Sequence, residues 1–196
     1  MKSILTAAIL ATFTTLIACT PDKKTVETDI AEAASEEQTA TAATDTTLTD
    51  SKKELMQTIA HHTMFEIEMG KLAAQKGTTD DVKQNGQQME QLYKTRLTEL
   101  QEMAQAYNVS LDTTLAEDHR KHITDLEQQK AADFDKKYWE TLTDTQKETL
   151  GEYEDVLKDI TEADATAFGI WARTSEKELR AQYEQALAQQ QQLKNR

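Results

Sequence analysis

The helical character of the chain is clearest in residues 66–89, which read EIEMGKLAAQKGTTDDVKQNGQQM. Apolar residues recur there at spacings of three and four, which is the period of one face of an α-helix. Gly77 interrupts the pattern, and the Thr-Thr-Asp-Asp sequence of residues 78–81 follows. This sequence is typical of a helix start, because a threonine hydroxyl caps free backbone N–H groups and carboxylates favour the positive end of a helix. Residues 66–89 therefore predict two helices joined by a tight turn.

The same spacing continues on both sides of this turn. It predicts four long helices and one shorter helix, over residues 52–76, 79–108, 113–130, 133–160 and from 161 onward. Asp50 or Ser51 is expected to cap the first helix and Thr161 the last. No segment alternates polar with β-branched or aromatic residues as a strand does. We expect an all-α fold, an up-and-down four-helix bundle with one additional shorter helix, over residues 51–193.

Each predicted helix has one face that should be buried. The residues expected to face the interior are Leu55, Ile59, His62, Glu66, Met69 and Ala73; Val82, Met89, Leu92, Arg96, Leu100, Met103 and Tyr107; Leu115, His119, His122 or Ile123, and Leu126; Phe134, Tyr138, Leu142, Thr149, Tyr153, Val156 and Ile160; and Phe168, Trp171, Ser175, Leu179, Tyr183 and Ala186. About 140 residues are enough to build one core.

The first eighteen residues have the pattern of a secretory signal peptide. Lys2 supplies the positive start, and residues 4–18 carry no charge. This run is shorter than the roughly 20 apolar residues that a membrane-spanning helix needs. Cys19, the only cysteine, follows Leu-Ile-Ala and resembles the lipobox cysteine of bacterial lipoproteins, whose sulfur receives a diacylglyceryl group. We predict a signal peptide over residues 1–18 and lipidation of Cys19; the alternative is an ordinary cleaved signal.

A lipidated Cys19 would place the protein in the cell envelope. Each buried methylene contributes about 0.8 kcal/mol to membrane binding, so the two or three acyl chains of a lipoprotein hold it firmly. Thr20, and not aspartate, follows the cysteine. By resemblance to the sorting of enterobacterial lipoproteins, this residue favours the outer membrane, with the protein facing the periplasm.

Residues 19–50 predict a disordered acidic tether. They contain no aromatic residue and no glycine, and eight acidic residues face two lysines. Val26, Ile30 and Leu48 are the only large aliphatic residues. So little apolar surface cannot offset the conformational entropy that ordering the segment would cost.

The negative charge of the chain restricts its partners. The formal net charge is −13, whereas nucleic-acid binding needs a basic patch. Anionic lipid head groups would also repel the chain, so the membrane contact should come from the lipid on Cys19. Acylation of this cysteine leaves no thiol for a disulfide. We expect an envelope protein as partner and no nucleic acid.

Five segments of the helical region resemble one bacterial family, the domain of unknown function 4142. They are residues 66–73 (EIEMGKLA), residues 82–83 leading to Met89, Leu111, residues 134–138 (FDKKY) and residues 179–183 (LRAQY). Together they span nearly the whole helical region in the order of the family. Many members are exported or lipidated, and they adopt a ferritin-like helical bundle, so the resemblance implies this fold.

The chain departs from the family at three positions. Members commonly carry histidines four residues after the methionine of the second helix, about eight residues after the Phe-Asp-x-x-Tyr tyrosine, and in the last helix. Here those positions hold Tyr93, Gln146 and Gln182. A ferritin-like di-metal site needs inward carboxylates and Glu-x-x-His pairs, and the chain contains no Glu-x-x-His pair. We therefore expect no cofactor.

His62 and Glu66 are the remaining candidates for a metal site in the interior. They lie one turn apart on the first predicted helix, with Glu68 nearby. The interpretation that we favour is that His62 and Glu66 pair with each other, or with Arg96, inside the bundle.

Two other groups of residues have a functional and a structural interpretation. His119 and His122 could bind a metal together with Glu117 or Asp118, but the basic residues between them indicate a solvated helix face. Tyr138, Trp139 and Trp171 could line a ligand pocket, but aromatic residues in the middle of bundle helices more often form core.

The sequence leaves two classes of function. The first is a non-enzymatic, lipid-anchored helical module with an accessory or protein-interaction role in the envelope, in a stress context. The second is a ferritin-like protein that binds metal and handles iron or oxidants. The missing carboxylate–histidine pairs favour the first class. A nucleophilic hydrolase is disfavoured, because the chain lacks a Gly-x-Ser-x-Gly motif and its one thiol should be lipidated.

Overall fold

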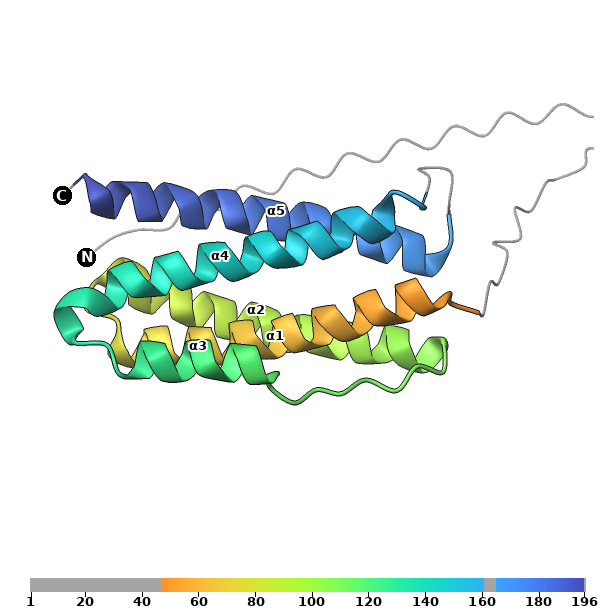
Figure 1. Cartoon of the computed structure of the whole chain (residues 1–196), viewed down its shortest axis with the longest axis horizontal. Coiled ribbons are helices and arrows are strands. Elements are labelled where there is room, and N and C mark those ends of the chain that lie inside the picture. The colour runs from red at the N-terminus through yellow and green to blue at the C-terminus, as the bar shows by residue number, and fades with distance from the viewer. Residues whose placement is uncertain (1–46, 161–164, 196) are drawn as a thin grey trace, which may run out of the picture. The chain divides into compact units, whose positions relative to one another are not determined.

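The computed structural model describes residues 47–160 and 165–195. Within these residues lie no strand and five helices, namely α1 (Asp50–Lys76), α2 (Asp80–Ala106), α3 (Glu117–Glu127), α4 (Ala131–Leu157) and α5 (Ala167–Lys194) (Figure 1). The expected all-α bundle of four long helices and one short helix is confirmed. The predicted signal peptide, Cys19 and most of the predicted tether lie outside the described residues.

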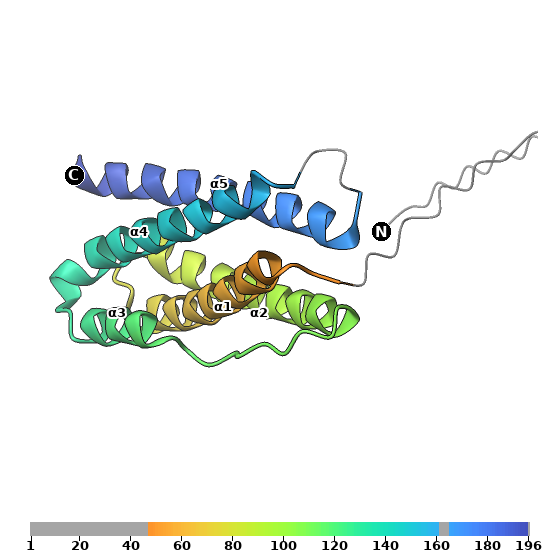
Figure 2. The same ribbon diagram turned by 45° about the vertical axis from the view of Figure 1, so that its right-hand side comes forward.

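The long helices form two antiparallel pairs, α1 with α2 and α4 with α5 (Figure 1). Helix α1 also packs along α4 and so joins the two pairs. The connection from α2 to α4 returns along the bundle and contains α3, which packs against α1 (Figure 2). A four-helix bundle with one such long crossover is the arrangement of ferritin-like folds. No helix of the described residues is long and apolar enough to cross a membrane.

The predicted turn between α1 and α2 is present. Gly77 ends α1, and its backbone N–H donates to the carbonyl of Ala73 at 2.9 Å. Thr79, one of the two expected caps, begins α2, and its hydroxyl accepts a hydrogen bond from the N–H of Val82 at 3.4 Å. Asp80 and Asp81 occupy the first turn of α2, as predicted.

A buried carboxylate on α4 holds this turn in place. Asp135 accepts hydrogen bonds from the backbone N–H groups and hydroxyls of both Thr78 and Thr79, at 2.7–2.9 Å. It is buried although it is charged. Hydrogen bonds to an ionised group are about twice as strong as neutral ones, so this contact ties the α1–α2 turn to the second pair of helices.

The backbones of α1 and α2 touch at two glycines. A Cβ atom on Gly86 would lie 2.6 Å from both the backbone nitrogen of Ala74 and the carbonyl oxygen of Gly70. A Cβ atom on Gly70 would lie 2.7 Å from the backbone nitrogen of Glu90. Any larger side chain at these positions would force the two helices apart.

The start of the bundle differs from the prediction. Thr49, and not Asp50 or Ser51, caps α1, and its hydroxyl accepts from the N–H of Lys52 at 3.4 Å. Leu48 is only 4% exposed and packs in the core. The last residues of the predicted tether therefore belong to the folded domain.

The crossover also differs from the prediction, because α3 spans only Glu117–Glu127. The side chain of Gln57 on α1 bonds both the N–H and the carbonyl of Asp112, at 2.9 and 2.7 Å. These bonds hold the start of the predicted third helix against α1 as a connecting segment. At the other end of the bundle Thr166, and not Thr161, caps α5; Thr161 lies outside the described residues.

The interior face of α2 is turned slightly from the prediction. Leu92, expected inside, is 37% exposed, whereas Tyr93 is 4% exposed. The tyrosine can be buried because its hydroxyl finds a hydrogen-bond acceptor, the side chain of Gln182 on α5.

Candidate functional site

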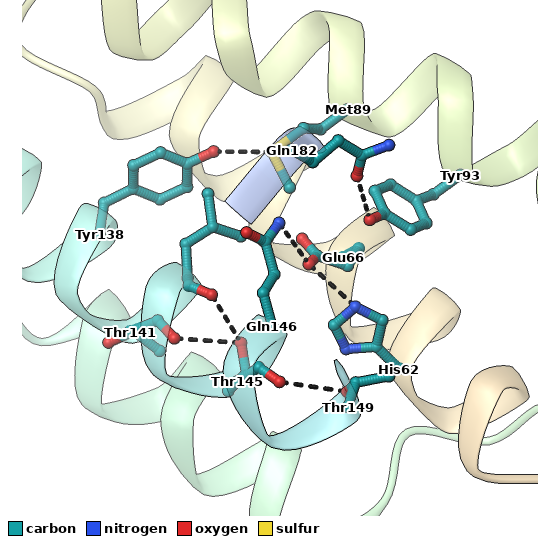
Figure 3. A network of polar contacts seen from close by, with 11 residues as sticks. His62, Glu66, Met89, Tyr93, Tyr138, Thr141, Thr145, Gln146, Thr149 and Gln182 are labelled. Carbon is teal, nitrogen blue, oxygen red and sulfur yellow. Dashed lines mark hydrogen bonds and ion pairs between the residues drawn. The ribbon is translucent and has the colours of Figure 1, made fainter. Parts of the chain in front are cut away.

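Polar side chains divide the interior of the bundle at mid-length. One apolar cluster includes Phe65 and Leu142, and the other includes Leu55 and Leu150. On each long helix, polar groups lie where one cluster gives way to the other; on α2 this group is the hydroxyl of Tyr93, whose ring belongs to the first cluster. We call these residues the polar layer: His62 and Glu66 of α1, Tyr93 of α2, Gln146 of α4 and Gln182 of α5 (Figure 3). The three positions at which the sequence departs from the family pattern thus lie in the same layer as Glu66.

Glu66 is the most deeply buried charged residue of the polar layer, with no exposed surface. Its Oε1 atom accepts a hydrogen bond from Nε2 of Gln146 at 3.1 Å. Nε2 of His62 lies 3.1 Å from the same oxygen, at ion-pair distance but without the angles of a hydrogen bond. Oε2 of Glu66 and Oε1 of Gln146 have no hydrogen-bond partner. The expected pairing of His62 with Glu66 is therefore present.

Two buried tyrosines donate hydrogen bonds near this carboxylate. The hydroxyl of Tyr93 donates to Oε1 of Gln182 at 2.5 Å, and that of Tyr138 donates to Oδ1 of Asn85 at 2.6 Å. Burial raises the pKa of both phenols well above the ordinary value, and the charge of Glu66 raises the pKa further. Both hydroxyls therefore stay protonated at physiological pH and are engaged with amide oxygens.

Threonines on α4 add polarity to the interior without adding free donors. The hydroxyl of Thr145 donates to the carbonyl of Thr141 at 3.0 Å, and that of Thr149 donates to the carbonyl of Thr145 at 3.1 Å (Figure 3). Such bonds to the preceding turn satisfy a buried hydroxyl within its own helix. These threonines are consequently part of the structural core.

A small cavity reaches the polar layer from the side between α2 and α5. Its volume is about 30 Å³, and His62, Tyr93, Leu100 and Trp171 are among its lining residues. Arg96 also lines the cavity, and its ion pair with Glu178 of α5, at 2.5 Å, spans the two helices. A space of this size holds about one or two water molecules.

The residues of the polar layer do not fit a di-metal centre. A ferritin-like site takes carboxylates and imidazoles from four helices, whereas here the one carboxylate and the one imidazole both come from α1. Glu68 lies outside the layer and pairs with Lys71 at 2.7 Å. Within the described residues, no group of three or more His, Cys, Asp or Glu side chains is arranged to hold a metal ion.

His119 and His122 occupy a different environment from the solvated face that the sequence indicated. The ring of His119 stacks on Phe65 of α1, with ring centroids 4.7 Å apart, and the ring of His122 meets Phe65 edge-on at 6.2 Å. Glu117 pairs with Arg120 at 2.9 Å. The solvated-face interpretation thus holds for Arg120 and Lys121, whose side chains are exposed. It does not hold for the two histidine rings, which pack on Phe65 in line with their expected inward positions.

The aromatic residues separate into two groups. Tyr138 and Trp139 are fully buried core residues, as expected. Trp171 packs at the edge of the core and lines the cavity between α2 and α5. Of the three residues, only Trp171 lines a cavity, so the interpretation as pocket residues does not hold for Tyr138 and Trp139.

The protein is thus a single-crossover helical bundle whose polar layer holds a buried carboxylate, an imidazole, a phenol and two amides. The chain belongs to the family described as "Domain of unknown function (DUF4142)", whose family model matches residues 37–189. This match confirms the resemblance of the helical segments to that family. Comparisons with curated proteins and with solved structures gave no match.

Proposed function

We propose that this protein is a lipid-anchored helical-bundle protein of the bacterial cell envelope, facing the periplasm from the outer membrane. Its role is non-enzymatic, as an accessory or protein-interaction module in a stress context. The lipobox-like sequence before Cys19 supports the anchor. The formal charge of −13 supports a membrane contact made by lipid and not by the protein surface.

The composition of the polar layer supports a non-enzymatic role. Three of its five residues are neutral, and two of these, Tyr93 and Gln182, bond to each other. Gln146 is bonded to Glu66. The cavity beside them has room for about one or two water molecules. A site of this kind stabilises the bundle and offers neither a nucleophile with a base nor a set of metal ligands.

One observation favours the second candidate, a metal-binding protein. Both ring nitrogens of His62 and Oε2 of Glu66 are buried without a hydrogen-bond partner. A buried polar group without a partner costs about 1–3 kcal/mol, more when it is charged. A cation held between these two side chains would remove that cost, so the proposal needs a direct test with metal ions.

Metal retention separates the two candidates. Purified protein is soaked with iron(II), manganese(II) or zinc(II), desalted, and its metal content is measured by elemental mass spectrometry. We expect less than stoichiometric retention of each ion, because one carboxylate and one imidazole provide too few strong ligands. Glu66→Ala, which removes the carboxylate, is expected to retain as little as the wild type. Glu68→Ala, in which the lost carboxylate lies outside the polar layer, is the matched control.

Lipid anchoring is tested by replacing Cys19 with alanine. We expect this variant to lose labelled palmitate and to move from the membrane fraction to the soluble fraction, with its helical circular dichroism unchanged. The physical reason is that the variant lacks the sulfur that carries the acyl chains. Thr20→Asp is the matched control, since it leaves the cysteine in place and should still incorporate palmitate. Label incorporated into Cys19→Ala would show that the acyl chains are carried elsewhere.

The interaction role requires partners in the envelope. Crosslinking in living cells, followed by mass spectrometry, identifies the proteins that the anchored bundle contacts. Crosslinks to envelope proteins that disappear in Cys19→Ala cells would support a role that depends on the anchor.

A further inference from the structure

Three of the four histidines of the chain lie where α1 meets α3 and the connection before it, and the fourth, His62, points into the polar layer. His61 and His62 lie on α1, and His119 and His122 lie on α3. Helix α3 packs against α1 and more lightly against α4. The α1–α3 contact is therefore rich in histidine, the side chain whose ordinary pKa lies between pH 5 and 8.

Helix α3 covers an apolar part of α1. Phe65 has no exposed surface, and the rings of His119 and His122 lie against it. Leu126 of α3 is also fully buried and belongs to the same core cluster as Phe65. Removal of α3 would therefore expose a contiguous hydrophobic surface on α1.

Helix α3 has little intrinsic stability. It has only 11 residues, and its N-cap, Ala116, makes no side-chain capping bond. Isolated helices shorter than about 12–15 residues are marginal in water. Its order thus depends on packing against α1 and on the hydrogen bond from Nζ of Lys76 to the carbonyl of Glu127.

His119 is the residue at this interface that resists protonation. Its Nδ1 atom is buried and has no hydrogen-bond partner. Burial lowers the pKa of His119 to about 4; Asp118 acts in the opposite direction, and His62, His122 and His61 lower the pKa further.

The other charged groups near α3 interact with residues other than His119. On α1, Glu66 is close to His62, and His61 lies 4.0 Å from Asp112 of the connection before α3. On α4, the charge of Lys137 acts on Asp125. Among the groups that act on His119, Asp118 is the only one that favours its charged form.

We propose that α3 is an acid-releasable cover, which detaches from α1 when His119 becomes protonated and thereby exposes Phe65. A detached α3 leaves His119 in water, where its ordinary pKa is 6.5. The attached state binds a proton only near pH 4, so the detached state takes up more protons as the pH falls below 6.5, and detachment becomes more favourable. The population of the detached state should rise roughly thirtyfold between pH 7.5 and pH 5.0. This detachment of α3 does not depend on lipidation of Cys19.

Hydrogen exchange of the full chain tests this proposal. Protection factors, corrected for the intrinsic pH dependence of exchange, are measured for amides of α1, α3 and α4 at pH 7.5 and pH 5.0. In the wild type, we expect the protection of α3 to fall roughly thirtyfold at the lower pH, while the interior of α4 keeps its protection. His119→Phe keeps an aromatic ring on Phe65 and removes the titrating group, so the change in α3 should shrink to less than about threefold.

Two further variants complete the test. His61→Gln, which changes a part-exposed histidine at the same interface, is the matched control and should retain the pH response of the wild type. His119→Gln loses the stacked ring, and we expect faster exchange of α3 at both pH values with little difference between them. Equal protection of α3 at both pH values in the wild type, or an undiminished pH response in both His119 variants, would overturn the proposal.

Discussion

Replacing Asp135 with alanine is expected to lower the free energy of unfolding by about 3–5 kcal/mol. The reason is that Asp135 accepts four hydrogen bonds from Thr78 and Thr79. Its removal takes a charged acceptor from two backbone N–H groups of the part-buried α1–α2 turn, and a hydrogen bond to a charged group contributes about 1.5–3 kcal/mol. The thermal midpoint should fall by on the order of 10 °C, which differential scanning calorimetry measures.

Two further variants test whether the effect comes from the buried carboxylate of Asp135. Asp135→Asn keeps one oxygen but places an amide group against the donors, so it should also be clearly destabilising. Asp125→Asn removes an exposed carboxylate that pairs with Lys121 on α3. It should leave the thermal midpoint unchanged, because exposed ion pairs contribute little. Equal midpoints for Asp135→Ala and wild type would show that the carboxylate does not hold the turn.

Replacing Gly86 with alanine is expected to destabilise the bundle by about 2–3 kcal/mol. The added Cβ atom would lie 2.6 Å from the backbone nitrogen of Ala74 and 2.8 Å from the Cβ of Ala73. Because these atoms belong to the backbone or to the shortest of side chains, α1 and α2 must separate to admit it. Alanine favours a helix over glycine by about 1 kcal/mol, and the steric cost is expected to exceed this gain. Urea unfolding followed by circular dichroism measures the difference.

Gly151 provides a control of opposite sign. It lies in α4, is exposed, and has no atom within 4 Å of the position that a Cβ would take. Gly151→Ala should therefore stabilise the protein by up to about 1 kcal/mol through helix propensity alone. If Gly86→Ala also stabilised the protein, the close approach of α1 and α2 would not be required for folding.

The helices were predictable from the sequence because each carries a periodic apolar face. Gly77 and the Thr-Thr-Asp-Asp start of α2 are strong local signals, and the structure has both. The length of α3 was not predictable, because Gln57 holds Asp112 from 55 residues away along the chain. The inward side of α2 depends likewise on a distant residue, Gln182, which accepts the hydrogen bond of Tyr93.

The candidate site was predictable in part. The spacing of four between His62 and Glu66 indicated their pairing, and the structure places them 3.1 Å apart. The convergence of Tyr93, Gln146 and Gln182 on the same layer depends on the packing of three other helices, which no local pattern contains. Asp135 was missed because Phe-Asp-x-x-Tyr reads as a helical segment, and nothing nearby signals that its carboxylate reaches Thr78. Lipidation of Cys19 stays a prediction.

We propose that the polar layer stabilises the bundle and holds no metal ion. Metal content after soaking with zinc(II) and desalting tests it most directly, because His62 and Glu66 are side chains of the kinds that bind zinc. We expect well below one zinc ion per chain, with no difference between wild type and Glu66→Ala. Retention of one or two ions per chain by the wild type and the Glu68→Ala control, lost in Glu66→Ala, would contradict it.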